Sequence, residues 1–193
     1  MAVIKYKGQR VGVLMDVQNL YHSAKHLYNS RVNFKEVLKK AVAGRNLIRA
    51  LAYVVRTETG EERPFFDALG RAGIEIKVKD LQVYAGGMKK GDWDVGLAID
   101  AVRLAPSLDV VVIASGDGDF APLVEYLKNQ GKQVEIVAFG KSSSARLKEV
   151  AEDFIDLGED PEHFLMKILD GGAIRHPLRR RNNAANARTT PSA

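Results

Sequence analysis

Apolar runs alternate with helical patterns along most of this chain, and this alternation constrains the fold more than any other feature. Residues 11–15 (VGVLM) and 110–114 (VVVIA) are apolar without a break. Unbroken apolar strands are typical of a parallel sheet that is covered by helices on both faces. The pattern therefore predicts an α/β fold, a three-layer sandwich with a central, mostly parallel sheet.

The expected elements follow from the period of the apolar residues. Strands are predicted at 11–15, 47–55, 74–79, 110–114, 133–139 and 154–157. Helices are predicted at 17–28, 34–43, 61–72, 94–104, 120–129, 143–152 and 161–169. These elements form one domain over residues 1–170, because a chain of 193 residues is too short for two comfortable domains. Residues 171–193 have almost no apolar content and are predicted to be a disordered basic tail.

The net charge of +5 first suggests a nucleic-acid partner, but its position weakens that argument. Residues 171–193 hold five arginines and no acid, so the 29 basic residues fall to 24 elsewhere, against 24 acids. The chain has no cysteine, which excludes disulfides, thiolate zinc sites and a cysteine nucleophile. No apolar run is long enough for a membrane span and no signal peptide is apparent, so we expect a cytoplasmic protein without membrane contact.

Three aspartates directly follow predicted strands. Asp16 comes after the first strand, and Asp117 and Asp119 come after the strand at 110–114. Ligands of parallel α/β folds bind outside the carboxyl ends of the strands. We therefore expect these carboxylates to lie together at that edge. Each also has a purely structural alternative, since Asp16 and Asp119 are suited to cap the following helices and Asp117 to a turn.

Asp94 is predicted to join this cluster from the first turn of the helix at 94–104. A helical wheel groups six apolar residues on one arc, and Asp94 falls within it, whereas Asp100 is placed outside, pointing away beside Arg103. The arc consists of Val95, Ala98, Ile99, Ala101, Val102 and Ala105. A carboxylate on a buried arc needs a partner, although Asp94 is also suited to cap the helix start and point outward.

Four carboxylates at one place require protons or a cation, because unit charges about 4 Å apart repel by about 4 kcal/mol at an effective dielectric near 20. An oxygen-only ligand set suits Mg²⁺ or Mn²⁺. Such an ion activates water and neutralises phosphoryl charge, which phosphodiester hydrolysis needs.

Four further residues are predicted to contact substrate near these acids. Asn19 and Ser115 are placed to orient water or a phosphate, with local hydrogen bonding as their structural alternative. Lys89 and Lys90 lie in a Gly-rich segment before Asp94 and are placed to meet a phosphate backbone, unless that segment is simply a solvated loop.

Four segments resemble the NYN domain, and most closely its bacterial LabA-like branch. They are VGVLMDVQNLY, KKGDWDVGLAIDAV, VVVIASGDGDFAPLVEYLKNQGKQVEIVAFG and SSARLKEVAEDFIDL, and they span about residues 11–157. The resemblance implies a PIN-like (Rossmann-like) nuclease fold and a metal-dependent ribonuclease. It assigns metal binding and catalysis to Asp16, Asp94, Asp117 and Asp119. It also includes Asp100, which the helical wheel makes a secondary residue.

The preferred hypothesis is a Mg²⁺- or Mn²⁺-dependent endoribonuclease with RNA as its partner. The alternative is a non-catalytic regulator of gene expression that binds RNA or protein on the same fold. A small-molecule phosphatase is disfavoured, because Asp16-Val17-Gln18 lacks the D-x-D pair that such enzymes place after the first strand. A homodimer is compatible with a domain of this size, but no residue indicates one.

Overall fold

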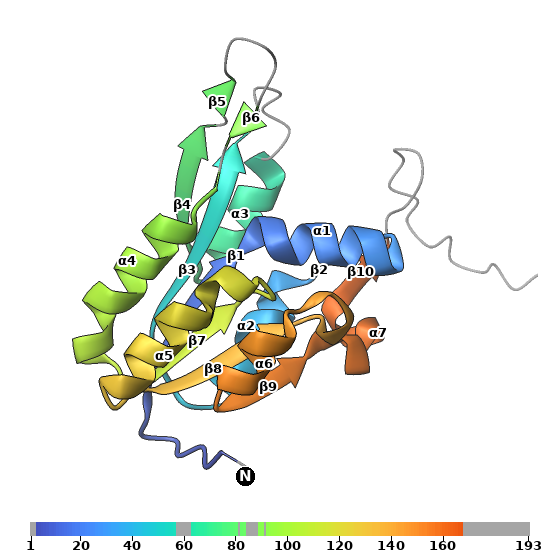
Figure 1. Cartoon of the computed structure of the whole chain (residues 1–193). Coiled ribbons are helices and arrows are strands. Elements are labelled where there is room, and N and C mark those ends of the chain that lie inside the picture. The colour runs from blue at the N-terminus through green and yellow to red at the C-terminus, as the bar shows by residue number, and fades with distance from the viewer. Residues whose placement is uncertain (1–2, 57–62, 81, 84–88, 91, 168–193) are drawn as a thin grey trace, which may run out of the picture.

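The computed structural model describes residues 3–56, 63–80, 82–83, 89–90 and 92–167. It contains a central six-stranded sheet in which all neighbouring strands are parallel (Figure 1). In spatial order the strands are β4 (Glu75–Asp80), β3 (Asn46–Arg56), β1 (Arg10–Asp16), β7 (Val110–Ala114), β8 (Gln133–Ala138) and β9 (Asp153–Asp156). The predicted α/β sandwich is confirmed.

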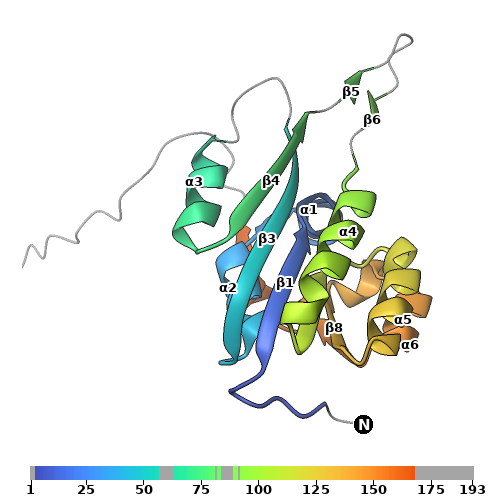
Figure 2. The ribbon, with the colours of Figure 1, turned by 90° about the vertical axis from the view of Figure 1, so that its left-hand side faces the viewer.

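Helices cover both faces of this sheet, as the edge-on view in Figure 2 shows. One face packs against α1 (Val17–Tyr28), α2 (Phe34–Val42), α3 (Arg63–Arg71) and α7 (Pro161–Phe164). The other packs against α4 (Asp94–Leu104), α5 (Ala121–Asn129) and α6 (Ala145–Val150). Two small antiparallel pairs complete the described part: β2 (Ser30–Val32) with β10 (Leu165–Lys167), and β5 (Gln82–Val83) with β6 (Lys89–Lys90).

The unbroken apolar pattern of β1 is explained by burial on both faces. Val13 and Met15 enter the core layer beneath α1 and α2, whereas Leu14 enters the layer beneath α4 and α5. Successive side chains of a strand point to opposite faces, so a strand between two helical layers has no position for an exposed polar residue.

The direction of strand addition reverses at β1. The chain proceeds from β1 to β3 and β4 on one side of it, and later adds β7, β8 and β9 on the other side. In doubly wound sheets the crevice at such a reversal, outside the carboxyl ends of the strands, is the usual ligand site. Met15 of β1 pairs with Ala114 of β7, so both strands end at the same level and their following residues meet there.

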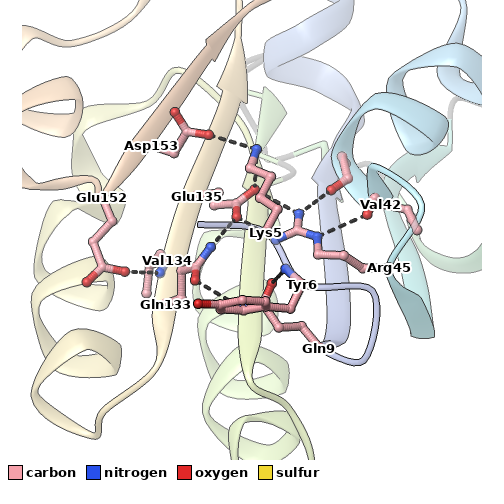
Figure 3. Close-up of polar contacts among 11 residues, drawn as sticks. Lys5, Tyr6, Gln9, Val42, Arg45, Gln133, Val134, Glu135, Glu152 and Asp153 are labelled. Carbon is pink, nitrogen blue, oxygen red and sulfur yellow. Dashed lines mark hydrogen bonds and ion pairs between the residues drawn. The ribbon is translucent and has the colours of Figure 1, made fainter. Parts of the chain in front are cut away.

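A buried ion pair stabilises the opposite, amino-terminal edge of the sheet (Figure 3). Arg45 donates to both carboxylate oxygens of Glu135, at 2.6 and 2.9 Å, and both side chains are at most 1% exposed. Lys5 lies 3.3 Å from the same carboxylate, and Gln133 donates to it at 2.6 Å. Glu135 is therefore neutralised entirely from within the fold.

Most predicted elements are confirmed within a few residues, but the C-terminal prediction is wrong. The predicted helix at 161–169 ends at Phe164, and Leu165–Lys167 continues as a strand that pairs with β2. Pairing with Ser30–Val32, which was not predicted as a strand, overrides the helical preference of this short segment. The predicted tail at 171–193 lies outside the described residues. Among the helices that the structure describes, none has the length and apolar character needed to cross a bilayer.

Candidate active site

Asp16 is the last residue of β1 and also the N-cap of α1. Its Oδ1 accepts a hydrogen bond from the backbone N–H of Asn19 at 3.1 Å, and its Oδ2 accepts one from the Ser115 hydroxyl at 3.1 Å. The capping role considered from the sequence is thus real. It also fixes the carboxylate at the carboxyl edge of the sheet, so the structural role and a functional role do not compete.

The loop after β7 is held against Asp16 by two polar side chains. Ser115 is fully buried, and its hydroxyl donates to Asp16 and accepts from the N–H of Asp117 at 3.2 Å. The Asn19 side-chain oxygen accepts from the N–H of Gly116 at 2.9 Å. Both residues therefore hold the ends of β1 and β7 together. Their contact with substrate stays a prediction.

Gly116 allows this loop to pass close to the segment that follows β8. A Cβ atom on Gly116 would lie 2.6 Å from the Ser143 hydroxyl oxygen and 3.1 Å from the Ser143 Cα. Since one of these atoms is backbone, a larger residue would displace the loop that carries Asp117. Asp117 in turn caps a 3₁₀ turn, Gly118–Phe120, by accepting from the N–H of Asp119 at 3.0 Å. The capping role considered for Asp119 falls to Asp117, and Asp119 is exposed.

Asp94 begins α4 and faces the same edge, although only part of the predicted apolar arc is buried. Val95, Ile99 and Val102 are 71%, 45% and 38% exposed. The buried residues are Leu97, Ala101 and Ala105. Asp94 precedes Leu97 by three residues and Ala101 by seven, so it lies on the true buried face as well. Ala101 and Ala105 of the predicted arc are thus buried as expected, and Asp94 lies on their side of the helix.

Asp100 does not point into solvent, as predicted, but toward β3. Its side chain is only 17% exposed, accepts a hydrogen bond from the Tyr53 hydroxyl at 3.0 Å and lies 3.4 Å from Lys77. Asp100 is thus engaged in the sheet–helix contact six residues along α4 from Asp94. The sequence analysis did not identify this partner, although Tyr53 carries the one hydroxyl group in β3.

Electrostatic repulsion links the four aspartates. Burial, followed by the charges of Asp16, Asp117, Asp92 and Asp119, raises the pKa of Asp94 from 3.8 to about 6. Burial also raises the pKa of Asp16; hydrogen bonds from Asn19 and Ser115 oppose this increase, and the charge of Asp117 adds to it. Since opposite charge would lower these pKa values, the cluster is an environment that favours a cation.

The donor set matches the requirements of Mg²⁺ or Mn²⁺, but it does not form a closed cage. Among the residues that the structure describes, no three Asp, Glu or His side chains converge closely enough to enclose one ion. Mg²⁺ does not require such a cage, because it usually keeps several waters and binds through one or two carboxylates together with substrate phosphates. An open set of carboxylate ligands at the strand ends is therefore suitable for Mg²⁺.

Lys89 and Lys90 form β6, which pairs with β5 next to the start of α4 in the chain. The sequence predicted a Gly-rich loop there, and the residues between the two strands lie outside the described part. Phosphate contacts by these lysines stay a prediction.

The sequence matches the NYN domain over residues 10–158, which is most of the described chain. The chain belongs to the NYN domain family. This family includes PIN-like nucleases, which agrees with the parallel sheet and the strand-end acids described above.

The chain is similar to two curated proteins and to one solved structure. The "Low amplitude and bright protein LabA" of Synechococcus elongatus is 21% identical over 169 residues, covering 80% of this chain and 87% of that protein. The uncharacterized protein MJ0482 of Methanocaldococcus jannaschii is 33% identical over 72 residues, covering 36% of this chain and 30% of its own. A crystal structure of VPA0982 from Vibrio parahaemolyticus, a protein of unknown function, superposes with a TM-score of 0.75 at 30% identity. It covers 85% of this chain and 100% of its own.

Proposed function

We propose that this protein is a metal-dependent endoribonuclease that hydrolyses RNA phosphodiester bonds at Asp16, Asp94, Asp117 and Asp119. The observation that carries the proposal is the position of these carboxylates at the carboxyl edge of the sheet, where Asp16 and Asp117 follow neighbouring strands and Asp94 begins α4. Burial and the surrounding carboxylates raise the pKa of Asp94 to about 6, and acids perturbed in this way at a crevice are candidates for a functional site. The RNA substrate is supported by the family, since NYN domains include PIN-like nucleases.

The four carboxylates are the residues that would hold Mg²⁺ or Mn²⁺. Such an ion, when bound, supplies a Lewis acid that favours ionisation of water and neutralises charge on the phosphate. Asp16 and Asp117 are the better fixed of the four, because Ser115 hydrogen-bonds to the side chain of one and the backbone of the other. Asp94 and Asp119 approach from α4 and from the 3₁₀ turn.

Asp94 is the residue that we assign to orienting the attacking water. It begins α4 at the carboxyl edge of the sheet, and its side chain is half-buried beside Asp16 and Asp117. A half-buried carboxylate with a raised pKa is also a better proton acceptor than a fully solvated one.

Contacts with the RNA backbone are assigned to Lys89, Lys90 and the arginines of residues 171–193. Residues 1–170, which include both lysines, are formally neutral, so the net positive charge of the chain lies in residues 171–193. Binding that depends on them weakens with salt, because each phosphate that a cation neutralises releases a counterion.

The sharpest test is Asp117→Asn. The amide oxygen can still accept from the N–H of Asp119, so the 3₁₀ turn is preserved while one negative charge is lost. We expect wild-type protein to cleave a mixed RNA pool with Mn²⁺, and the variant to lose this activity without a decrease in melting temperature. Asp67→Asn, an exposed acid on α3 at the other face of the sheet, is the matched control. Undiminished cleavage by Asp117→Asn would refute the assignment.

A second candidate is a non-catalytic regulator that binds RNA or protein. It is favoured by the absence, among the described residues, of three acids that converge on one point. A metal titration separates the two candidates. A regulator binds RNA equally well with chelator and releases no product with Mn²⁺, whereas a nuclease requires the ion for cleavage.

A further inference from the structure

Trp93, the residue immediately before Asp94, is fixed against β3 by its ring and its N–H group. The indole N–H donates to the carbonyl of Val54 at 2.9 Å. The ring meets Tyr53 edge to face, with centroids 5.5 Å apart and planes at 60°. A Cβ atom on Gly96 would lie 2.5 Å from the indole, so only glycine leaves room for this ring beneath the first turn of α4.

Contacts on either side of Trp93 hold the same turn in place. The Leu97 N–H donates to the Trp93 carbonyl at 2.7 Å, which closes the first helical turn. Lys79 of β4 donates to the carbonyl of Asp92 at 3.0 Å, and its ammonium lies 5.9 Å from the centre of the Trp93 ring. The chain that leads into α4 is thus attached to both β3 and β4.

Tyr53 connects this attachment to Asp100. Tyr53 is 1% exposed, and its hydroxyl donates to Asp100 at 3.0 Å. Burial, followed by the charge of Asp100, raises the pKa of Tyr53 well above its ordinary value of 10, so the phenol stays protonated and remains a donor. Lys77, 3.4 Å from Asp100, compensates the carboxylate charge. The Tyr53 ring, which packs against Trp93, is therefore itself held in place by Asp100 of α4.

The same tyrosine lies beside Asp16 in the sheet. Tyr53 of β3 is the register partner of Asp16 of β1, so the distance from Trp93 to Asp16 is set through one strand pair. This matters because Asp16, Asp117 and Asp119 carry the same charge as Asp94 and repel its carboxylate. The start of α4 also has no side-chain cap, since its N-cap residue is Trp93. Without an anchor, repulsion would move the first turn of α4 away from the strand ends.

We propose that Trp93 and Asp100 are positioning residues that hold Asp94 at the acid cluster, Asp100 acting through Tyr53. This inference rests on the proposed function, in which Asp94 contributes to metal binding. It gives Asp100, the last residue of the segment DVGLAID at 94–100, a role distinct from that of a metal ligand. Residues that orient metal ligands typically contribute about 10–100-fold to metal affinity.

The test compares Trp93→Ala, Asp100→Ala and Asp100→Asn with the wild-type full chain. The first measurement is amide hydrogen exchange of Leu97 and Ala98, the first hydrogen-bonded amides of α4, in the presence of chelator, which requires no metal site. The second is Mn²⁺ affinity by calorimetry. We expect Trp93→Ala and Asp100→Ala to accelerate exchange in this turn and to weaken Mn²⁺ binding by about 10–100-fold. Asp100→Asn keeps an acceptor for the Tyr53 hydroxyl, so we expect it to remain close to wild type in both.

Val37→Ala is the control for loss of stability, because Val37 is fully buried on α2 at the other face of the sheet. It should lower the melting temperature without changing either measurement at α4. Unchanged exchange in Trp93→Ala overturns the proposal, as does faster exchange with undiminished Mn²⁺ affinity. Equal losses of affinity in Asp100→Asn and Asp100→Ala overturn it too, because they would identify Asp100 as a ligand. Absence of Mn²⁺ binding by the wild type refutes the proposed function instead, and the exchange measurement still decides whether Trp93 and Asp100 fix this turn.

Discussion

Replacing Asp94 with asparagine should stabilise the metal-free protein at neutral pH. The pKa of Asp94 is about 6 in the fold and near its ordinary 3.8 when unfolded. The folded state therefore binds more protons between pH 4 and 6, and stability falls as pH rises through that window. This difference in pKa corresponds to about 3 kcal/mol. Because Asp94 is only half-buried, solvent screening reduces the expected effect to about 1 kcal/mol.

The measurement is urea unfolding of wild type and Asp94→Asn, with chelator, at pH 4.5 and 7.5. We expect similar free energies of unfolding at pH 4.5, where the wild-type carboxyl is largely protonated. At pH 7.5 the variant should be about 1 kcal/mol more stable, equivalent to about 2–4 °C in melting temperature for a fold of this size. Subtracting the free energy of unfolding of the wild type from that of the variant removes the contribution of other titrating groups, such as Asp109, whose pKa is lowered by Arg10.

Two results would refute this reasoning. One is a stability difference that stays the same at both pH values, since the raised pKa requires it to grow with pH. The other is a variant less stable than wild type at pH 7.5, which would mean that the Asp94 carboxylate makes a favourable interaction in the fold. Under the proposed function, Mn²⁺ at 100 times the Kd should stabilise the wild type by about 2.7 kcal/mol. This exceeds the lead of the variant and reverses the order of stability.

Two further substitutions test the ends of the sheet. Asn19→Ala should lower the free energy of unfolding by about 1–3 kcal/mol, because it leaves the buried N–H of Gly116 without its acceptor. It should also reduce Mn²⁺-dependent cleavage by about 10–100-fold. Urea unfolding and a cleavage assay measure the two effects, and undiminished cleavage would contradict a role of Asn19 at the site. Arg45→Met leaves the buried charge of Glu135 short of its main partner and should cost about 3–5 kcal/mol in urea unfolding. The double variant with Glu135→Met should cost less than this single change, and an equal or greater cost would show that the pair is not the source of the loss.

The strand-end acids could be predicted because their position depends on chain order alone. Once two unbroken apolar strands are neighbours in a parallel sheet, the residues that follow them must meet at one edge. The positions of Asp16 and Asp117 could therefore be predicted without any knowledge of side-chain packing. The hydrogen bond from Ser115 to Asp16 could not be predicted in the same way, because it depends on which rotamer the close approach of the two strands allows.

The phase of α4 could not be predicted from its sequence, because the helix has two apolar arcs. Val95, Ile99 and Val102 form one, and Leu97 with Ala101 forms the other. The predicted arc combined the first group with Ala101 and Ala105 and left out Leu97. The structure buries the second, since Trp93 and Asp100 attach to β3 and this fixes the rotation of the helix. Contacts between residues some 40 positions apart in the chain thus decided the phase.

The two charged centres at opposite edges of the sheet are compensated in opposite ways. At the amino edge, Arg45 and Lys5 neutralise the buried charge of Glu135 from within the protein. At the carboxyl edge, the ion pairs formed by the described residues include none of the four aspartates of the proposed site. The sequence supplies ample lysine and arginine, so this edge is not left negative for lack of cations. A cluster that the described residues leave without an ion pair weakens the fold, because burial and like charge raise the pKa of Asp94, and this supports our proposal of a cation supplied from outside the chain.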